Sequence, residues 1–322
     1  MIPEKIKKIL KKQHYEIVGN HSAVQVCRWT KKSLRDEGVC YKEKFYGIKS
    51  HLCCQMTPAV MWCENKCLHC WRAIELTLGD KLEKGDSVSE IIDGCVEAQR
   101  KLLLGFKRGK EKNLSKANMK KYEEAQEPMQ FAISLSGEPM IYEKVGELIE
   151  ELRRRGKTSF LVTNGLHPEK ILELKEKNQL PTQLYISVNA SNKKLYDRFH
   201  RSSMKDAWEK LNESLEILGE LPCRSVFRMN LVKDLNMKEE HVKEYVEMIK
   251  KAKPMFVEVK GFMSVGFARQ RLGYDKMPSY EEMLEFVKKL ATATELKLLD
   301  SHEHSRAFVL GKSKEELWIR RI

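Results

Sequence analysis

The sequence lacks any apolar run that approaches the ~18 residues needed to cross a bilayer as a helix. Its first residues, MIPEKIKKILKKQHYEIVG, are basic and amphipathic, without the continuous apolar stretch or the small-residue cleavage site of a secretory signal. It also has no internal repeat and no Gly/Ser-rich linker. These absences argue against a membrane protein, a secreted protein and a repeat protein, and we expect a cytoplasmic globular protein.

Acidic residues are in deficit relative to basic ones. The 322 residues include 59 Lys or Arg against 46 Asp or Glu, so the formal net charge is +13. An excess of this size favours a polyanionic partner, of which nucleic acid is the most common. The alternative is a Lys/Glu-rich solvated surface of the kind found in heat-adapted proteins.

The nine cysteines are unevenly distributed, because seven of them lie between Cys27 and Cys70. A disulfide framework is uncommon in a cytosolic chain of this length, whereas clustered cysteines indicate a metal site or catalysis. The remaining two, Cys95 and Cys223, are isolated, and we expect them to be ordinary buried residues.

Short β-rich runs alternate with charged amphipathic segments along most of the chain. This alternation predicts βαβ units, an α/β fold and a parallel sheet. Six such units would form a partial (β/α)6 TIM-like barrel, and a doubly wound open sheet is the alternative. The predicted strands are MTPAVMW, MQFAISLSG, TSFLVTNG, QLYISVNA, RSVFRMNLV and MFVEVKGFMSVG. We expect an N-terminal extension at 1–56, a core domain at 57–300, and a C-terminal tail at 301–322 that packs on the core.

Three cysteines follow the first predicted strand with the spacing C-x3-C-x2-C. They are Cys63, Cys67 and Cys70, and no fourth cysteine is near. A structural zinc site needs four ligands. His69 could be the fourth, but it lies between Cys67 and Cys70, where the loop would have to fold back on itself. A four-iron cluster held by three thiolates would leave one iron open to a small molecule. A zinc knuckle is the alternative.

This loop resembles the signature of the radical S-adenosylmethionine (SAM) enzymes. In that family, the amino and carboxylate groups of SAM chelate the open iron, and the reduced cluster cleaves the sulfonium to give a 5′-deoxyadenosyl radical. The resemblance covers about 57–300 and implies the partial barrel of this superfamily.

Polar residues at the ends of later predicted strands lie where the radical SAM family places its cofactor contacts. Parallel α/β folds build their sites at these strand ends, and the alternative for each is an ordinary turn residue. VKGFMSVG (259–266) resembles the segment that lines the adenine. The resemblance implies SAM contacts from Gly137, Glu138, Thr163, Asn164, Ser187, Asn189, Arg228 and Asn230.

A second group of cysteines lies upstream, spaced C-x12-C-x12-C. Cys27, Cys40 and Cys53 could hold another cluster with an open iron, and Cys54 is a bystander or an alternative ligand. A zinc site or three unrelated cysteines are the other interpretations.

The stretch CYKEKFYGIKSHLCCQMTP, followed by MWCENKCLHCW, is similar to the 4-demethylwyosine synthase family of radical SAM enzymes. The resemblance implies a lyase with two [4Fe-4S] clusters, one for SAM and one held by Cys27, Cys40 and Cys53. It implies that two carbons of pyruvate are joined to N1-methylguanosine at position 37 of tRNA-Phe, which closes a third ring. Eukaryotic members add an N-terminal flavodoxin-like domain that is not seen in this sequence, so the chain resembles the archaeal form. We therefore expect a separate electron donor, such as a flavodoxin or ferredoxin. We also expect a monomer.

Two arrangements for pyruvate follow from this resemblance. Pyruvate could chelate the open iron of the second cluster, or it could form a Schiff base with a lysine. Lys42, two residues after Cys40, is the candidate, and an exposed surface lysine is the alternative.

Recognition of an RNA base favours aromatic stacking flanked by phosphate contacts. The candidates for stacking are Trp29, Tyr41, Phe45, Tyr46, Trp62 and Trp71. The candidates for phosphate contacts are the basic stretch 105–121 and Arg269, Arg271, Arg320 and Arg321. A zinc-stabilised RNA-binding protein, or a radical SAM enzyme with another substrate, would be the alternative functions.

Overall fold

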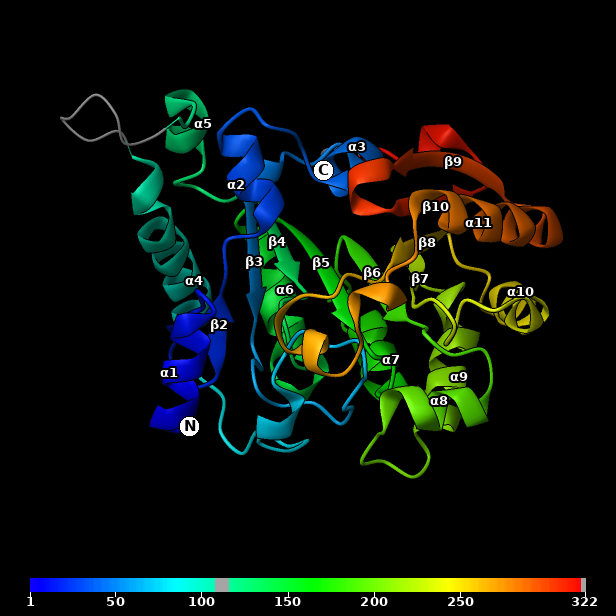
Figure 1. The fold of residues 1–322 in the computed structure, drawn as a ribbon. Coiled ribbons are helices and arrows are strands. Elements are labelled where there is room, and N and C mark those ends of the chain that lie inside the picture. The colour runs from blue at the N-terminus through cyan, green and yellow to red at the C-terminus, as the bar shows by residue number, and fades with distance from the viewer. Residues whose placement is uncertain (108–115, 320–322) are drawn as a thin grey trace. The chain divides into compact units, whose positions relative to one another are not determined.

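The computed structural model describes residues 1–107 and 116–319, and the chain divides into two compact units (Figure 1). The first unit consists of Met1–Trp62, Lys81–Leu161 and the C-terminal end from Ile319, and the second consists of Cys63–Asp80 and Val162–Trp318. The domain boundaries at 56 and 300 expected from the sequence stay a prediction.

In the first unit, the strands are hydrogen-bonded in chain order. β1, β2 and β3 pair antiparallel, whereas β3, β4 and β5 pair parallel, with Cys53 opposite Gln130. The strands are β1 (Glu16–Val18), β2 (Ser22–Val24), β3 (Cys53–Thr57), β4 (Gln130–Ile133) and β5 (Thr158–Thr163). The helices are α1 (Glu4–Lys12), α2 (Arg28–Leu34), α3 (Tyr41–Tyr46), α4 (Val88–Leu103), α5 (Met119–Glu124) and α6 (Val145–Arg154).

Helix α4 covers the antiparallel edge of this unit by packing on β1, β2 and β3 (Figure 1). It begins with a capping box, in which the Ser87 hydroxyl accepts from the Glu90 N–H and the Glu90 carboxylate accepts from the Ser87 N–H. Ile91, Ile92 and Cys95 form part of its fully buried face. The isolated Cys95 is therefore a core residue, as expected.

The first strand of the parallel set differs from the sequence prediction. β3 ends at Thr57, and the expected strand at 56–62 overlaps it by only two residues. Pro58 has no N–H to donate to a neighbouring strand, so pairing stops there. The cysteine loop consequently begins after an intervening turn at 58–62 rather than directly after the strand.

In the second unit, three parallel strands are extended by a hairpin. β6, β7 and β8 pair parallel, and β10 pairs antiparallel with both β8 and β9. The strands are β6 (Gln183–Ser187), β7 (Arg224–Leu231), β8 (Phe256–Gly261), β9 (Lys297–His302) and β10 (Ala307–Gly311). The helices are α7 (Pro168–Glu176), α8 (Lys193–His200), α9 (Ala207–Leu218), α10 (Val242–Ala252) and α11 (Tyr280–Thr294). The expected tail at 301–322 thus contains the end of β9 and all of β10.

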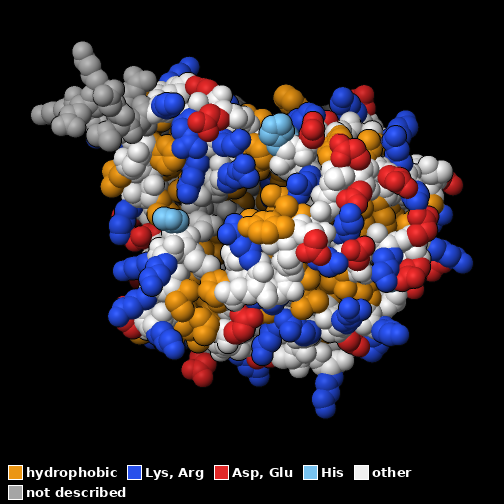
Figure 2. All heavy atoms as spheres, in the orientation of Figure 1, with side chains coloured by type: hydrophobic (Ala, Val, Ile, Leu, Met, Phe, Trp, Pro, Cys, Tyr) orange, Lys and Arg blue, Asp and Glu red, His pale blue; other side chains and the backbone are white. Residues whose placement is uncertain are grey.

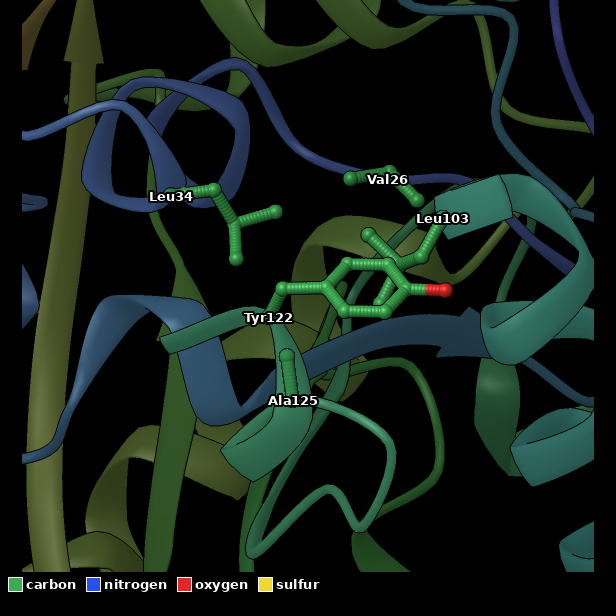
Figure 3. Packing of buried hydrophobic residues seen from close by; sticks show 5 residues of the cluster. All are labelled: Val26, Leu34, Leu103, Tyr122 and Ala125. Carbon is green, nitrogen blue, oxygen red and sulfur yellow. The ribbon is translucent and has the colours of Figure 1, made fainter. Parts of the chain in front are cut away.

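A small apolar cluster fixes the segment that carries Cys27. Val26, Leu34, Leu103, Tyr122 and Ala125 pack together, as Figure 3 shows. Leu34, Leu103 and Tyr122 belong to α2, α4 and α5, whereas Val26 lies before α2 and Ala125 directly after α5. Leu34 and Leu103 are completely buried. Because Val26 adjoins Cys27, this packing sets the position of the cysteine backbone.

Charges of both signs cover the surface. Lys and Arg side chains are spread over the face seen in Figure 2, with Asp and Glu among them. Within the basic stretch 105–121, residues 108–115 lie outside the described residues, as do Arg320 and Arg321. Among the described residues, no helix combines the length and the apolar character needed to span a membrane.

Candidate active site

The loop with Cys63, Cys67 and Cys70 is hydrogen-bonded to the C-terminal end of α8. The N–H groups of Lys66 and Leu68 donate to the carbonyls of His200 and Phe199 at 2.8 and 3.0 Å. The Arg201 guanidinium donates back to the Lys66 carbonyl at 2.9 Å. These main-chain contacts give the loop a defined shape although it contains no regular secondary structure.

Arg271 holds the other side of the loop. Its guanidinium donates to the carbonyls of Leu68, Cys70 and Arg72 and pairs with Glu75 at 2.9 Å. Its side chain is only 10% exposed. The expectation that Arg271 contacts phosphate is therefore wrong, because its donors are committed to the cysteine loop.

We predict that Arg271→Lys destabilises the cysteine loop. The lysine ammonium lacks the planar arrangement of N–H donors with which the guanidinium reaches several carbonyls. The free energy of unfolding should fall by about 2 kcal/mol, as measured by urea denaturation. Arg269→Lys is the matched control, since the Nε of Arg269 makes one hydrogen bond, to Ser264 O at 3.1 Å. Equal losses in the two variants would contradict this role.

The three thiols of the loop influence one another. Burial raises the pKa of the Cys67 thiol well above its usual range, Cys63 and Cys70 raise it further, and Arg72 opposes them. Among the described residues, no three His, Cys, Asp or Glu side chains close around a single ion position.

Two histidines lie beside the loop, His200 buried and His69 partly buried, and both have lowered pKa values. His200 Nδ1 lies 3.1 Å from Cys67 Sγ, and burial lowers the pKa of His200 to about 3. Burial also lowers the pKa of His69 to about 4, and its ring stacks on Phe199 with centroids 5.0 Å apart. His69 therefore packs against α8. No local pattern in the sequence predicted that His200 lies beside Cys67.

Gly137 adopts a conformation that only glycine tolerates well. Its φ is +69°, and a Cβ would lie 1.7 Å from the Ala59 carbonyl oxygen and 2.7 Å from that of Trp62. The next residue, Glu138, donates its N–H to the Trp62 oxygen at 2.8 Å. The Gly-Glu turn thus fixes the backbone that leads into Cys63.

We predict that Gly137→Ala lowers the free energy of unfolding by about 2–4 kcal/mol, because strain and a backbone clash add. Gly156→Ala is the matched control: its φ is +68° with no atom within 4 Å, so it should lose only about 1 kcal/mol. Urea denaturation measures both. If the two variants lost the same stability, the close approach at Gly137 would not matter.

The strand end after β5 is tied to the cysteine loop through Glu64. Asn164 Nδ2 donates to Glu64 Oε2 at 2.9 Å, and His167 Nε2 lies 2.5 Å from Glu64 Oε1. Glu64 is 2% exposed, and Thr163 Oγ1 accepts from the Gly165 N–H at 3.1 Å. The sequence analysis missed Glu64 because its partners lie about a hundred positions away.

The predicted residues after β6 and in β7 form a polar network. Asn189 Oδ1 accepts from the Asn230 N–H at 2.9 Å, and Asn236, which the sequence analysis missed, donates to the carbonyls of both residues. Arg228 pairs with the fully buried Glu258 at 3.4 Å. The last residue of β6, Ser187, is half-buried.

The structure also brings Cys27, Cys40 and Cys53 together, all within the first unit. Cys27 and Cys40 are the residues directly before α2 and α3, and Cys53 begins β3. Burial raises the pKa of the Cys53 thiol well above its usual range. The charge of Cys27 adds to this effect, whereas that of Lys42 opposes it.

Ser50 joins the segments that carry these three cysteines. Its hydroxyl accepts from the Cys40 N–H at 2.8 Å and donates to Glu43 Oε2 at 2.5 Å. Its carbonyl accepts from Thr30 Oγ1 of α2 at 3.0 Å. Ser50 is 1% exposed, and nothing in the sequence distinguished it from an ordinary loop serine.

The surroundings of Cys54 and Lys42 bear on two alternatives from the sequence: that Cys54 is a cluster ligand, and that Lys42 is an exposed surface lysine. Cys54 is fully buried, and its Sγ lies 4.0 Å from the Cys95 carbonyl, so it belongs to the core. Lys42 is 7% exposed, and its Nζ lies 4.7 Å from the centre of the Phe160 ring. The interpretation of Lys42 as an exposed surface lysine is wrong.

Most of the aromatic candidates for base stacking are core residues. Tyr41, Phe45, Tyr46 and Trp62 are all at most 5% exposed. Trp29 and Trp71 are partly exposed.

Family models match most of the chain. Residues 58–249 match the radical SAM superfamily, and residues 251–312 match the model described as wyosine base formation. The α/β fold with parallel strands that the sequence predicted is thus confirmed as a radical SAM fold.

Curated relatives agree with these matches. The SAM-dependent tRNA 4-demethylwyosine synthase of Pyrococcus abyssi is 46% identical over 90% of this chain and 83% of its own length. The Methanocaldococcus jannaschii protein of the same name is 35% identical over 98% and 99%. The Schizosaccharomyces pombe relative is 40% identical over 95% of this chain and 44% of its own length.

Solved structures of relatives have the same fold. "Structure of TYW1 with a lysine-pyruvate adduct bound" matches with a TM-score of 0.86 at 35% identity, over 99% of this chain and 98% of that one. "Crystal structure of archaeal TYW1" matches with a TM-score of 0.78 at 33% identity, over 99% of each chain. The chain is therefore a radical SAM enzyme that belongs to the family of SAM-dependent tRNA 4-demethylwyosine synthases.

Proposed function

We propose that this protein joins two carbons of pyruvate to N1-methylguanosine at position 37 of tRNA-Phe, and so forms the tricyclic base 4-demethylwyosine. The observation that carries the proposal is the burial of Lys42 beside the group of Cys27, Cys40 and Cys53. A buried lysine next to three thiols suits capture of a keto acid, because its amine is held in place and shielded from water. The names of the relatives support the same reaction.

Each cysteine group would hold one [4Fe-4S] cluster. The cluster on Cys63, Cys67 and Cys70, when reduced, supplies the electron that cleaves SAM into methionine and the 5′-deoxyadenosyl radical. The thiols of each group lie near one another, which fits this ligand set. The two cysteine groups lie on different segments of the chain, so the proposed sites for SAM and for pyruvate are separate.

Residues at the strand ends would bind SAM. Polar side chains held by hydrogen bonds are already oriented, which lowers the entropy cost of binding. The proposed contacts are Gly137, Glu138, Thr163, Asn164, Ser187, Asn189, Arg228 and Asn230.

Lys42 would hold pyruvate as an imine. Its amine attacks the keto carbon and water leaves, so the pyruvate becomes fixed on α3. The burial of Lys42 against Phe160 keeps water away from the imine and slows its hydrolysis. The solved structure of a relative with a lysine-pyruvate adduct bound supports this arrangement over simple chelation.

The new bonds would then form on this imine. Bound SAM would supply the acceptor for a hydrogen atom from the N-methyl group, and the resulting methylene carbon would bond to the former keto carbon. The carboxyl group would then leave as the carbon dioxide radical anion, which restores the carbon–nitrogen double bond to Lys42. The guanine amine displaces the nitrogen of Lys42, which closes the ring and regenerates the lysine.

The remaining partners are also proposals. Arg269, whose guanidinium lies 5.8 Å from the centre of the exposed Tyr274 ring, would contact the RNA backbone. A separate flavodoxin or ferredoxin would supply electrons to a monomeric, cytoplasmic enzyme.

An anaerobic assay tests the proposal. Reconstituted protein, dithionite, SAM and pyruvate are incubated with tRNA-Phe transcripts carrying either guanosine or N1-methylguanosine at position 37, and the digested nucleosides are analysed by mass spectrometry. We expect the tricyclic nucleoside only from the methylated transcript and only with pyruvate present. Equal conversion of both transcripts, or conversion without pyruvate, would refute the proposal.

A further inference from the structure

Arg72 is a buried arginine whose hydrogen-bonding capacity is largely unused. It is 3% exposed, and Nη2 donates to the Asn65 carbonyl at 3.3 Å. Nε and Nη1 have no hydrogen-bond partner within the described part of the chain. Leaving charged N–H groups unpaired in the interior is costly, so a bound acceptor is expected beside them.

The three-cysteine loop lies next to this guanidinium. Its Nη2 donates to the carbonyl of Asn65, which lies in the loop between Cys63 and Cys67, and the side chain is also hydrogen-bonded to Cys70. The unpaired N–H groups therefore lie in the electrostatic field of the same sulfurs that would hold the cluster. Thiolate and sulfide sulfurs accept hydrogen bonds from such donors.

His200 approaches one of these sulfurs from α8. Its Nδ1 is 3.1 Å from Cys67 Sγ, and its ring stacks on Tyr196 with centroids 4.4 Å apart. The residue is 2% exposed, and Nε2 has no partner among the described residues. A neutral imidazole with its single proton on Nδ1 would donate a hydrogen bond to a coordinated thiolate.

We propose that Arg72 and His200 are positioning residues that raise the reduction potential of the cluster held by Cys63, Cys67 and Cys70. Reduction adds one electron from an external donor to a buried site that already carries three thiolates. A fixed positive charge and an N–H donor stabilise the added charge, while no bond breaks and no proton moves. The inference rests on the proposed ligand set, and it does not depend on the identity of the RNA or keto-acid substrate.

The test is an anaerobic redox titration followed by EPR on the reconstituted full-length protein. The loop cluster is identified as the signal that changes when SAM is added. We expect Arg72→Gln and His200→Phe each to lower the equilibrium constant for reduction by about tenfold, which is about 59 mV for one electron. Arg72→Lys keeps the charge and His200→Asn keeps an N–H donor, so both should shift the potential less.

Matched controls separate tuning from loss of packing. Arg224 and His241 belong to the same unit, where Arg224 is hydrogen-bonded to the Leu317 carbonyl and His241 to the Ser191 hydroxyl. Arg224→Gln and His241→Gln should leave the potential unchanged even if they lower stability.

The proposal is overturned if Arg72→Gln and His200→Phe retain iron and an unchanged potential. It is also overturned if Arg72→Gln and Arg72→Lys both lose the loop cluster, because Arg72 would then be structural. Loss of the loop cluster in Arg72→Gln alone would likewise make Arg72 a residue that retains the cluster, and it would overturn the tuning role of Arg72. A wild-type protein without a SAM-responsive signal would contradict the ligand set itself.

Discussion

Lys42→Arg is expected to abolish formation of the tricyclic base, with a decrease of roughly a thousandfold or more. Arginine keeps the positive charge and much of the volume, but a guanidinium cannot form an imine with pyruvate. SAM cleavage in the absence of RNA should persist, because the loop with Cys63, Cys67 and Cys70 is unchanged. The measurement is nucleoside mass spectrometry, with deoxyadenosine counted in the same samples.

Borohydride trapping adds a direct readout of the same lysine. When borohydride reduces the imine between labelled pyruvate and the wild-type protein, the label should remain attached to a peptide that contains Lys42. Lys44→Arg is the matched control, since Lys44 lies on the same helix but is exposed, and it should trap pyruvate normally. Trapping that persists in Lys42→Arg, or normal product from that variant, would rule out an imine at this position.

Cys27→Ala is expected to remove one cluster and leave the other. After reconstitution, about eight irons per chain should fall to about four, and the tricyclic base should no longer form. Cys63→Ala should also lose about four irons, but it should lose SAM cleavage as well. Iron and acid-labile sulfide analysis, together with a deoxyadenosine assay, distinguishes the two variants.

Cys54→Ala is the control for these cysteine variants. Cys54 adjoins Cys53 in the sequence but lies against Cys95 in the core, so its loss should leave the iron content at the wild-type value. Loss of iron in Cys54→Ala, or full iron in Cys27→Ala, would mean that the proposed ligands of the second cluster are incorrect.

The order of strands and helices could be predicted because it depends on local patterns. The runs that contain Phe160, Tyr185 and Val226 are rich in apolar and aromatic residues, and each forms a mostly buried strand. The first strand was misplaced because MTPAVMW is apolar throughout, although Pro58 prevents the pairing of its second half. The hairpin of β9 and β10 was described only as a tail, because its place beside β8 depends on a long-range contact.

Some features of the candidate site could also be predicted from local sequence, whereas others depend on the fold. The cysteine spacings and the Gly-Glu turn are visible in the sequence because their members lie within a few positions of each other. The partners of the loop are not visible, since His200 meets Cys67 across 133 positions and Arg271 reaches Cys70 across 201. Such pairs depend on the fold, and a histidine or arginine in a basic chain carries no local signal.

The measurement that tests the central claim most directly is the fate of isotopically labelled pyruvate. Wild-type protein with both clusters is supplied with SAM and N1-methylguanosine-containing tRNA-Phe, and pyruvate is labelled either at the carboxyl carbon or at the other two carbons. The account predicts that the keto and methyl carbons enter the new ring of the base and that the carboxyl carbon does not. A tricyclic base without label from the keto and methyl carbons, or one that retains the carboxyl label, would contradict it.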